Sequence, residues 1–544
     1  MWRTKGDTDG EGENASGEGQ QTSQEGRPSD QYGRQEPNER TRLLDHPRPP
    51  PHADGYLDPD DPAVSPYNLW TVRFLRAFTV LFLIISFLWW ALLLVSIFVS
   101  PPGLHTRGSG FFDFAYTCLT IGNLLVAVIF FVAPAKAVRI TTAIIAVLLF
   151  IDMIIILSVP RLRLEEGWVG IASVIWAALM AIWCIITDRV VAWGKREEEE
   201  RLTGRPETRR SVREWLAVTL ATAFAIIFVI IVILLTGTLG LRARDTTLPM
   251  YGDRILVDGD KYAVHLACVG NESYTAGKKD PTIILEAGEN PSEYDFEHWA
   301  YSAYQNGTIS RYCYWDRPGY AWSDNAPSPH SAGMSADALS EALAKQGEEG
   351  PWILVSAGTG SIVSRIFSSR HLKQVVGIML IDPIHEDLLH RIGSPWRGFV
   401  LWGWGVISPL GIERLGGAIF KGRTREDRVY GKYAYQNGKF IKAQLQENLV
   451  ADSLTKNEVA SARNIQLRDT PYVLISSGIR SRTDAEWERK QKDLAGLTDR
   501  LVAWDTVNRA PHEVWMTLKG RMVMEKRLGE LVEAARNVSS ERLG

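Results

Sequence analysis

The segment Ser356-Ala357-Gly358-Thr359-Gly360 has the outline of a tight turn that presents a nucleophile, but a glycine stands at its apex. In the matching pattern, G-x-S-x-G, a sharp turn between a strand and a helix exposes a serine hydroxyl. The apolar run 352–355 leads into the turn, and a helix-forming stretch, 361–371, leads out of it. Glycine has no atom that can attack a substrate, so the sequence excludes a covalent intermediate on residue 358.

Three hydroxyl side chains lie close to this apex in the sequence. Ser356 belongs to the expected strand and points away from the apex, Thr359 follows the apex, and Ser361 lies on the first turn of the helix. We therefore expect none of the three to act as a replacement nucleophile. A turn shifted by two residues, which would present Ser361, stays open as an alternative, although the strand length then fits poorly.

From about residue 250 onward, short apolar segments alternate with helical ones. Such a pattern is typical of a mostly parallel sheet that is covered by helices on both faces. The predicted fold class is therefore an α/β domain over 250–540, preceded by a multi-pass helical membrane domain. Strands are expected at 254–257, 262–269, 282–285, 311–316, 352–356, 375–381, 472–476 and 501–504, with helices such as 335–346 and 485–497 between them.

The α/β region resembles the α/β-hydrolase superfamily, in particular its serine-hydrolase-like branch. Six segments carry the resemblance in the family's order: ILEAG at 284–288, YWDRPGYAWSD at 314–324, the turn at 356–360, IMLIDPIHED at 378–387, PYVLISSG at 471–478 and APHEVW at 510–515. Six landmarks in the expected order are far more specific than any one of them.

The resemblance implies a role for each residue of a catalytic triad. The nucleophile position falls on Gly358, where the family's serine is absent, and the base falls on His512. The acid falls on Asp382, after the strand that follows the turn, or alternatively on Asp484, after the next strand. In such a triad the histidine takes a proton from the nucleophile while the acid holds the imidazole in its working tautomer.

The resemblance also implies an oxyanion hole and a cap. One backbone donor would be the N–H of Thr359, and the other would come from the turn at Gly288 and Glu289. Residues 388–465 form an insertion where the family carries a cap, and 396–407 within it are rich in tryptophan and apolar residues. This stretch is either a lid that faces an apolar ligand or the membrane surface, or a helix packed on the core.

Before the α/β region lie a polar tail and a membrane domain. Residues 1–66 are rich in Gly, Glu, Gln, Ser and Pro, which predicts a disordered tail. Residues 67–241 contain five apolar stretches, each about long enough to cross a bilayer as a helix. They lie at 70–100, 111–133, 140–160, 168–187 and 215–240.

The distribution of basic residues predicts the orientation of these spans. The loop 188–214 carries eight lysines and arginines, and it shares its side of the membrane with the N-terminal tail. Since positive residues favour the cytosol, the N-terminus is expected there and the α/β domain is expected to be lumenal or extracellular. Sequons at Asn271, Asn306 and Asn537 agree with this orientation and predict a glycoprotein.

Two pairs of residues bear on the compartment. Cys268 and Cys313 lie on expected neighbouring strands and are either a disulfide or two separate buried thiols. Glu39, Leu43 and Leu44 fit an acidic dileucine sorting pattern, which predicts a sorting adaptor as a partner of the tail. The pattern favours an endomembrane of the vacuolar or lysosomal kind, with the plasma membrane as the alternative.

The leading interpretation is a membrane-anchored pseudo-hydrolase that binds a small apolar, lipid-like ligand or a partner. The alternative is an active hydrolase or lyase of lipid or ester substrates that uses His512 and Asp382 without the usual serine. A transporter is the least favoured class, because Asp152 is a single acid within the spans, with Asn123 as a conceivable partner. No metal, cofactor or nucleic-acid partner is predicted.

Overall fold

The computed structural model describes residues 64–204, 211–275 and 277–542 of the chain, with side chains described up to residue 538. Nearly all of the expected disordered tail, including the sorting pattern at Glu39, Leu43 and Leu44, lies outside the described residues. The described part begins with a short 3₁₀ turn, η1 (Pro66–Asn68), which leads into the first long helix.

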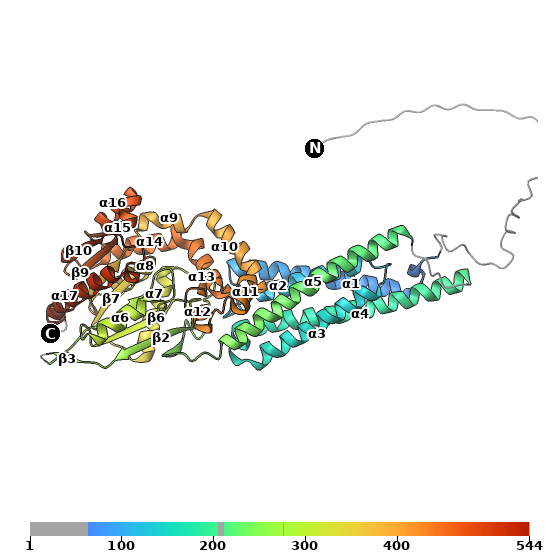
Figure 1. Ribbon diagram of the computed structural model, residues 1–544, viewed down its shortest axis with the longest axis horizontal. Helices are drawn as coiled ribbons and strands as arrows, with labels where there is room; N and C mark the ends of the chain where they lie inside the picture. Colours follow the sequence, from blue (N-terminus) through green and yellow to red (C-terminus); the bar gives the residue numbers. More distant parts are fainter. Residues whose placement is uncertain (1–63, 205–210, 276, 543–544) are drawn as a thin grey trace, which may run out of the picture. The chain divides into compact units, whose positions relative to one another are not determined.

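Five helices, each long and apolar enough to cross a membrane, run side by side in the described N-terminal half (Figure 1). They are α1 (Trp70–Phe98), α2 (Phe111–Ile129), α3 (Lys136–Ser158), α4 (Pro160–Thr203) and α5 (Val212–Asp245). This confirms the predicted helices, but α4 and α5 extend well beyond their apolar stretches. Charged residues sustain the extension, because Lys195 of α4 pairs with Glu199 and also with Glu214 of α5.

The acid inside the third span has a hydrogen-bond donor within the bundle for one of its two oxygens. The hydroxyl of Tyr116 on α2 donates a hydrogen bond to Oδ2 of Asp152 over 3.1 Å, and Asp152 is fully buried. The partner is therefore Tyr116 rather than Asn123. A buried carboxyl with a neighbouring donor stabilises helix packing, which gives no support to a transport pathway.

The C-terminal half is built on one eight-stranded sheet with the order β1-β2-β6-β5-β7-β8-β9-β10. The strands are β1 (Asp253–Val257), β2 (Tyr262–Gly270), β5 (Thr282–Glu286), β6 (Arg311–Asp316), β7 (Trp352–Ala357), β8 (Val375–Ile381), β9 (Tyr472–Ser477) and β10 (Leu501–Val507). The pairs β1–β2 and β2–β6 are antiparallel, whereas every pair from β6 to β10 is parallel. The predicted fold class and all eight expected strands are confirmed. A separate short hairpin joins β3 (Tyr274–Thr275) to β4 (Lys278–Lys279).

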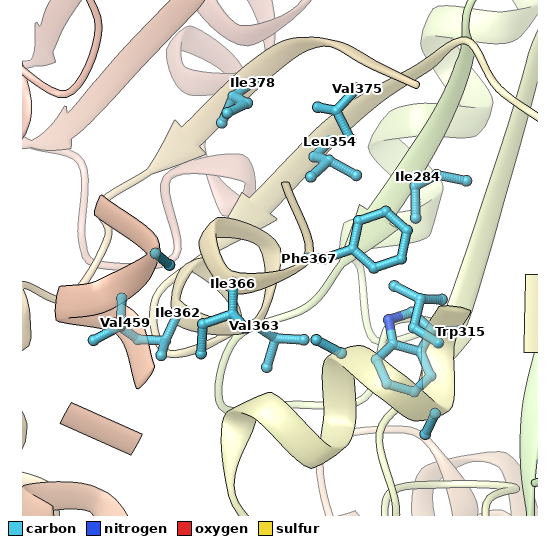
Figure 2. Close-up of a cluster of buried hydrophobic side chains, with 14 of the residues drawn as sticks. Ile284, Trp315, Leu354, Ile362, Val363, Ile366, Phe367, Val375, Ile378 and Val459 are labelled. Carbon is cyan, nitrogen blue, oxygen red and sulfur yellow. The ribbon is translucent and has the colours of Figure 1, made fainter. Parts of the chain in front are cut away.

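Helices cover both faces of this sheet, since alternate side chains of the central strands point to opposite faces. On one face, Leu354 and Ile378 pack with Phe367 of α8 (Gly360–Arg370), beside α7 (Ala332–Gln346) and α14 (Lys456–Ile465) (Figure 2). On the other face, Val355 lies in a second cluster with Trp299 of α6 (Phe296–Gln305) and with residues of α17 (Leu518–Arg542). The two clusters hold β7 and α8 rigidly on either side of the turn at 356–360.

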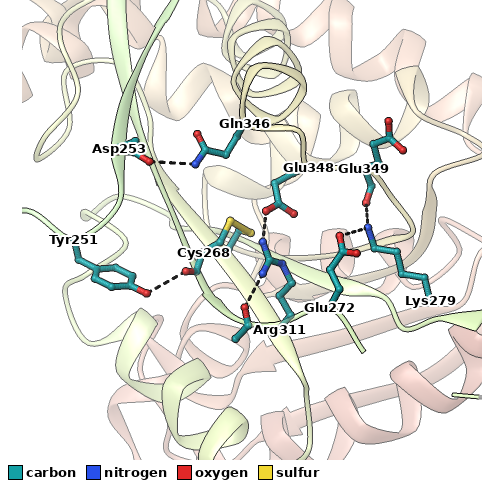
Figure 3. The surroundings of a disulfide bond; sticks show 11 residues. Tyr251, Asp253, Cys268, Glu272, Lys279, Arg311, Gln346, Glu348 and Glu349 are labelled. Carbon is teal, nitrogen blue, oxygen red and sulfur yellow. Dashed lines mark hydrogen bonds and ion pairs between the residues drawn. A yellow bond between two sulfur atoms is a disulfide. The ribbon is translucent and has the colours of Figure 1, made fainter. Parts of the chain in front are cut away.

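Cys268 and Cys313 are joined by a disulfide between the antiparallel strands β2 and β6, where they are directly opposite (Figure 3). Beside this bond, Arg311 donates to the carbonyl of Gly270 over 2.6 Å and pairs with Glu348. The asparagines of the three sequons, Asn271, Asn306 and Asn537, are all exposed.

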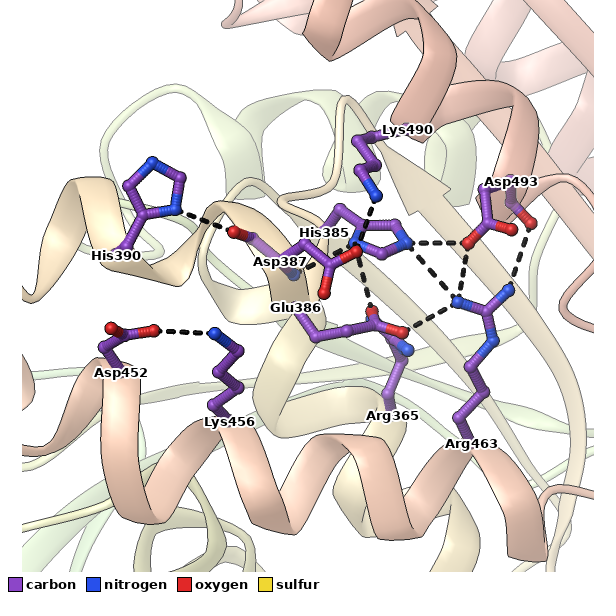
Figure 4. Close-up of polar contacts among 10 residues, drawn as sticks. All are labelled: Arg365, His385, Glu386, Asp387, His390, Asp452, Lys456, Arg463, Lys490 and Asp493. Carbon is purple, nitrogen blue, oxygen red and sulfur yellow. Dashed lines mark hydrogen bonds and ion pairs between the residues drawn. The ribbon is translucent and has the colours of Figure 1, made fainter.

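The chain between β8 and β9 forms the predicted cap. Its helices are α9 (Leu389–Ile392), α10 (Pro395–Ile407), α11 (Ile412–Phe420), α12 (Arg425–Val429), α13 (Gly438–Val450) and α14, with short turns η2 (Glu386–Leu388), η3 (Ser408–Leu410), η4 (Ala434–Gln436) and η5 (Ala451–Thr455). At its base, Glu386 pairs with Arg365 of α8 and Arg463 of α14, and Arg463 also pairs with Asp493 (Figure 4). These ion pairs fix both ends of the cap to the sheet domain.

The tryptophan-rich helix α10 does not pack on the sheet. Gly405 lies so close to Phe111 of α2 that a Cβ there would be 2.0 Å from the ring. The next helix, α11, places Leu415 against Gly237 of α5. Trp396 and Phe399 remain 71% and 60% exposed. Leu401, Trp402 and Val406 of α10 pack against a buried cluster of residues from α1, α2 and α13. The helix therefore contacts the apolar helices and is also partly packed on a core, so neither expectation for it is excluded.

Buried ion pairs join the cap to the ends of the long helices. Arg242 of α5 pairs with Glu165 over 2.9 Å and with Glu166 over 2.6 Å, both on α4. Lys439 of α13 donates to the same Glu165 over 3.1 Å. All these side chains are less than 10% exposed, so each charge depends on its partner.

A second group of buried ion pairs lies one helical turn further along α5. Asp245 accepts from Arg414 of α11 over 2.6 Å and from Arg428 of α12 over 2.5 Å. Arg161 of α4 adds a hydrogen bond of 2.8 Å to the carbonyl of Trp322 in the sheet domain. The sheet domain, its cap and the helical bundle are thus tied together by charges that cannot be exposed singly.

Replacing Arg242 with alanine should strongly destabilise the protein, because it would leave the buried Glu166 without its cation and remove one of the cations of Glu165. Loss of one partner of a buried pair costs on the order of 3–5 kcal/mol. We expect the thermal unfolding temperature of the detergent-solubilised full chain to fall by several degrees. Arg244→Ala is the matched control, because Arg244 is exposed on the same helical turn and makes no ion pair among the described residues. Equal shifts in the two variants would contradict the assignment.

Candidate active site

The turn between β7 and α8 has the backbone geometry of a tight strand-to-helix elbow. Gly358 has a φ of 46°, a conformation that favours glycine. Its N–H donates to the carbonyl of Ile381 at the end of β8 over 3.0 Å, and its own carbonyl accepts from the Ser361 hydroxyl over 2.6 Å. The turn is therefore held on both sides, and residue 358 faces the space between two other side chains, Glu289 and His512.

Directly across this space lies a histidine–carboxylate pair. Nδ1 of His512 is 2.5 Å from Oδ2 of Asp382, which is fully buried at the end of β8. The other oxygen of Asp382 accepts from the backbone N–H of Ser477 and from Nε1 of Trp487, each over 3.0 Å. Asp382 itself has a φ of 43°, an unusual value for a residue with a side chain. Two donors thus hold this carboxylate toward the imidazole.

The alternative acid is used elsewhere. Asp484 caps the N-terminus of α16 (Ala485–Leu494) by accepting from the backbone N–H groups of Glu486 and Trp487. It also pairs with Arg391 over 2.5 Å. Of the two acids that the sequence left open, the structure brings Asp382 to His512 and engages Asp484 in a helix cap.

A carboxylate that the sequence did not single out fills the centre of the site. Oε2 of Glu289 is 3.1 Å from Nε2 of His512, and Oε1 accepts from the backbone N–H of Thr359 over 3.3 Å. A Cβ on Gly358 would lie 2.5 Å from Oε2 of Glu289 and 2.9 Å from Nε2 of His512. The Glu289 side chain therefore takes the room that a side chain at position 358 would need.

The residues named as oxyanion-hole donors, Thr359, Gly288 and Glu289, lie together. The backbone N–H groups of Thr359 and Glu289 face the carboxylate of Glu289. Gly288 lies against the elbow, because a Cβ there would be 3.1 Å from the carbonyl of Ala357 and 3.5 Å from Cα of Gly358. The Thr359 N–H and the N–H of Glu289 itself both stabilise the Glu289 carboxylate. The sequence indicates Glu289 only as a backbone donor. The signal for its side chain is an acidic residue in a turn that is expected to lie beside the glycine at position 358.

The Glu289 carboxylate and the His512 imidazole favour each other's charged form, whereas Nη1 of Arg480, 2.9 Å from Nδ1 of His512, opposes a positive charge on that ring. Burial alone would lower the pKa of His512, but the carboxylates of Glu289 and Asp382 raise that pKa to about 10. Burial alone would raise the pKa of Glu289, but the His512 imidazolium lowers it to about 2. Both groups are therefore charged at neutral pH. Arg480 stacks on Trp487 with its Cζ 3.7 Å from the ring centroid and adds a further positive charge beside Asp382.

The hydroxyls near the apex do not reach this pair. Ser361 donates to the Gly358 carbonyl, as described above. The hydroxyls of Ser356 and Thr359 are buried and have no hydrogen-bond partner among the described residues. Each of the three expectations from the sequence agrees with this geometry.

A small cavity lies beside the elbow, under the cap. Its volume is about 40 Å³, far below the several hundred cubic ångströms of a typical ligand pocket. It combines apolar side chains with a charged pair and includes Arg317, Thr359, Ile362, Leu389, Ile392 and Glu447. In this conformation the site has room for water but not for a substrate.

Neutralising Glu289 should reduce stability in a pH-dependent way. The raised pKa of His512 stabilises the fold fully below its ordinary value of 6.5, and this contribution is lost as pH rises toward about 10. The lowered pKa of Glu289 stabilises the fold fully above 4.5, and this contribution is lost as pH falls toward about 2. The difference in unfolding temperature between the wild type and Glu289→Gln should therefore be largest between these two ordinary values.

We expect a difference of no more than a few degrees, because the Glu289 side chain is 42% exposed and water screens the pair. Thermal unfolding of both proteins across a pH series measures it. Glu513→Gln is a suitable control, because Glu513 is next to His512 in sequence but contacts Asn290 instead. A difference that does not change with pH would contradict the charged pair.

Comparison with known proteins places the chain in a family. A model described as a region of unknown function (DUF2417) matches residues 39–268. An uncharacterized protein of Schizosaccharomyces pombe is 34% identical over 504 residues, which cover 87% of this chain and 92% of that protein. An uncharacterized vacuolar membrane protein of Saccharomyces cerevisiae is 25% identical over 386 residues, which cover 60% of each chain.

Solved structures similar to this chain are α/β hydrolases. The Cif epoxide hydrolase from Acinetobacter nosocomialis matches with a TM-score of 0.40 and 15% identity over 55% of this chain and 96% of that one. MGS-M2, an α/β hydrolase enzyme from a deep-sea metagenome library, matches with a TM-score of 0.37 and 12% identity over 51% and 95%. Because the match to the uncharacterized Schizosaccharomyces pombe protein extends over nearly the full length of both chains, the chain belongs to the family of that protein.

Proposed function

We propose that this chain is a membrane-anchored pseudo-hydrolase whose hydrolase-like site is occupied by its own Glu289 side chain. The observation that carries the proposal is the position of the Glu289 carboxylate. It contacts the imidazole of His512, accepts from the Thr359 N–H and takes the room at the apex. In a serine hydrolase these places belong to the nucleophile and to the oxyanion that forms during the reaction.

The protonation state of His512 supports the same proposal. A general base must be neutral in order to take a proton, and the most effective bases have a pKa near the working pH. The neighbouring carboxylates raise the pKa of His512 to about 10, so the imidazole is already protonated at neutral pH. A protonated imidazole between two carboxylates holds the loops of the site together instead of activating a hydroxyl.

We assign the domain a binding role rather than turnover, with either a small apolar ligand or a partner protein as the bound species. The cavity of about 40 Å³ beside Thr359 is lined in part by cap residues, so it admits a ligand only if its lining moves. Buried ion pairs to the long helices hold the cap and oppose such a movement. A partner that binds the closed surface needs no such movement.

The proposed place of action is a vacuolar membrane, with the N-terminus in the cytosol and the sheet domain in the lumen. The description of the Saccharomyces cerevisiae relative as a vacuolar membrane protein supports this location. The excess of basic residues in the loop 188–214 supports the orientation. The disulfide and the three exposed sequon asparagines are compatible with a lumenal domain.

One observation favours a second candidate, an active hydrolase or lyase. The pair of His512 and Asp382 is intact, with a separation of 2.5 Å and a buried carboxylate held by two further donors. If Glu289 leaves the site, the pKa of His512 falls and the imidazole becomes available as a base for water.

Restoring a nucleophile should distinguish these two functions, provided that Glu289 is removed at the same time. We expect the wild type to be silent toward p-nitrophenyl esters and toward a fluorophosphonate probe. Gly358→Ser combined with Glu289→Ala should react with the probe and hydrolyse the esters roughly 100-fold faster than the uncatalysed background. Gly358→Ser alone should remain weak, because the serine and the Glu289 carboxylate compete for the same space.

His512→Ala provides the controls for this experiment. Added to the double variant, it should abolish the gained activity, because the new serine would lose its base. Turnover by the wild-type chain that disappears with His512→Ala alone would refute the pseudo-hydrolase and establish the second candidate.

A further inference from the structure

A cavity of about 460 Å³ opens between three of the long helices, at the end of the bundle opposite the sheet domain. It is formed by the start of α3, the second half of α4 and the first turns of α5. The lining residues include four basic side chains and a tryptophan but no acid: Pro134, Ala135, Lys136, Ala137, Arg139, Arg189, Ala192, Trp193, Arg196 and Val218. Its size is within the range of small-molecule sites.

Most of the positive charge in this cavity is not neutralised by the protein. Arg139 pairs with Asp188 over 2.8 Å, which uses that carboxylate. Lys136, Arg189 and Arg196 are exposed and make no ion pair among the described residues. Three cations that line one concave space and make no ion pair among the described residues indicate a site for an anion.

The backbone at the same place is also suited to an anion. Helix α3 begins at Lys136 with no acidic residue in its first turn, although the carboxylate of Asp188 accepts from the N–H of Ala135, just before the helix, over 3.3 Å. The first N–H groups of a helix have no partner within the helix, and they carry the positive end of its dipole. Pro134, Ala135 and Ala137 line the cavity, so this helix start faces it directly. Phosphate groups are the ligands that such helix starts commonly bind.

The location at the end of the apolar helices suggests where the phosphate comes from. Trp193 lines the cavity and is 57% exposed, as expected for a ring at the level of the lipid headgroups. Basic pockets between membrane helices on the cytosolic side are suited to acidic headgroups. A volume of about 460 Å³ is more than one phosphate ion needs but is adequate for a phosphorylated sugar headgroup.

We propose that this cavity binds the phosphate groups of a phosphorylated lipid headgroup, through Lys136, Arg189, Arg196 and the N-terminus of α3. The same chemistry would accept a soluble phosphate ester, and the experiment separates the two sources. The site lies at the opposite end of the long helices from Glu289 and His512, so it is independent of the pseudo-hydrolase.

The test uses the full chain in detergent and three probes. These are dioctanoyl phosphatidylinositol 4,5-bisphosphate, soluble inositol 1,4,5-trisphosphate and dioctanoyl phosphatidylcholine, with binding followed by microscale thermophoresis. We expect the bisphosphate lipid to bind and phosphatidylcholine not to bind. Arg189→Ala combined with Arg196→Ala should weaken binding of the bisphosphate lipid by about tenfold or more, because each basic side chain near an acidic headgroup adds to the binding free energy.

A variant of equal charge provides the control. Arg73 and Arg213 are exposed on α1 and α5, outside the lining of the cavity, so Arg73→Ala with Arg213→Ala should weaken binding less than about threefold. Unfolding temperatures of both double variants establish that they are folded, and Lys136→Gln is a second, single-site probe of the cavity.

Tighter binding of the lipid than of inositol trisphosphate, lost in the cavity variant, supports the proposal and assigns a membrane source. Binding of inositol trisphosphate at least as tight as that of the lipid, with the same loss, supports the phosphate site and assigns a soluble source. Absence of binding, equal weakening in the two double variants, or equal binding of phosphatidylcholine would each overturn the proposal.

Discussion

Buried charges are stable only beside a partner, and this constraint determines how the sheet domain meets the apolar helices. Glu165 lies at the start of α4, where it accepts from Arg242 of α5 and from Lys439 of the cap. Asp245 binds two cap arginines in the same way. Because none of these charges could be exposed singly without a large cost, the cap is held against the bundle. A cap held in this way is poorly suited to act as a mobile lid, which agrees with the small volume beside the elbow.

The same rule operates inside the hydrolase-like site. A buried Asp382 beside His512 favours a protonated imidazole, and a protonated imidazole attracts a second carboxylate. The glycine at position 358 leaves the room for it, and Glu289 supplies it from a neighbouring loop. A side chain at position 358 and the Glu289 carboxylate therefore compete for the same space, so the carboxylate can occupy it only because residue 358 is glycine.

Much of this fold could be predicted from the sequence, because its signals are local. Apolar runs bounded by turn residues gave all eight main strands, and long uncharged stretches gave the five helices. The sequence indicates Cys268 and Cys313 as a possible disulfide but cannot distinguish it from two separate thiols, because disulfide formation depends on the register between their strands. The sequence favours Asp382 as the acid but leaves Asp484 open, because both follow a strand, and the contact of Asp382 with His512 decides between them.

The features that could not be predicted are contacts between segments far apart in sequence. Glu289 and His512 are separated by 223 residues, and nothing local to either residue shows that their side chains meet. The same holds for Asp152, whose donor is Tyr116 on another helix and not Asn123. The loss of a motif side chain, such as the serine replaced by Gly358, can be interpreted only when the neighbouring side chains are known, because one of them fills the space that is left. At Gly358 the carboxylate of Glu289 fills it and forms an ion pair with the imidazole of His512.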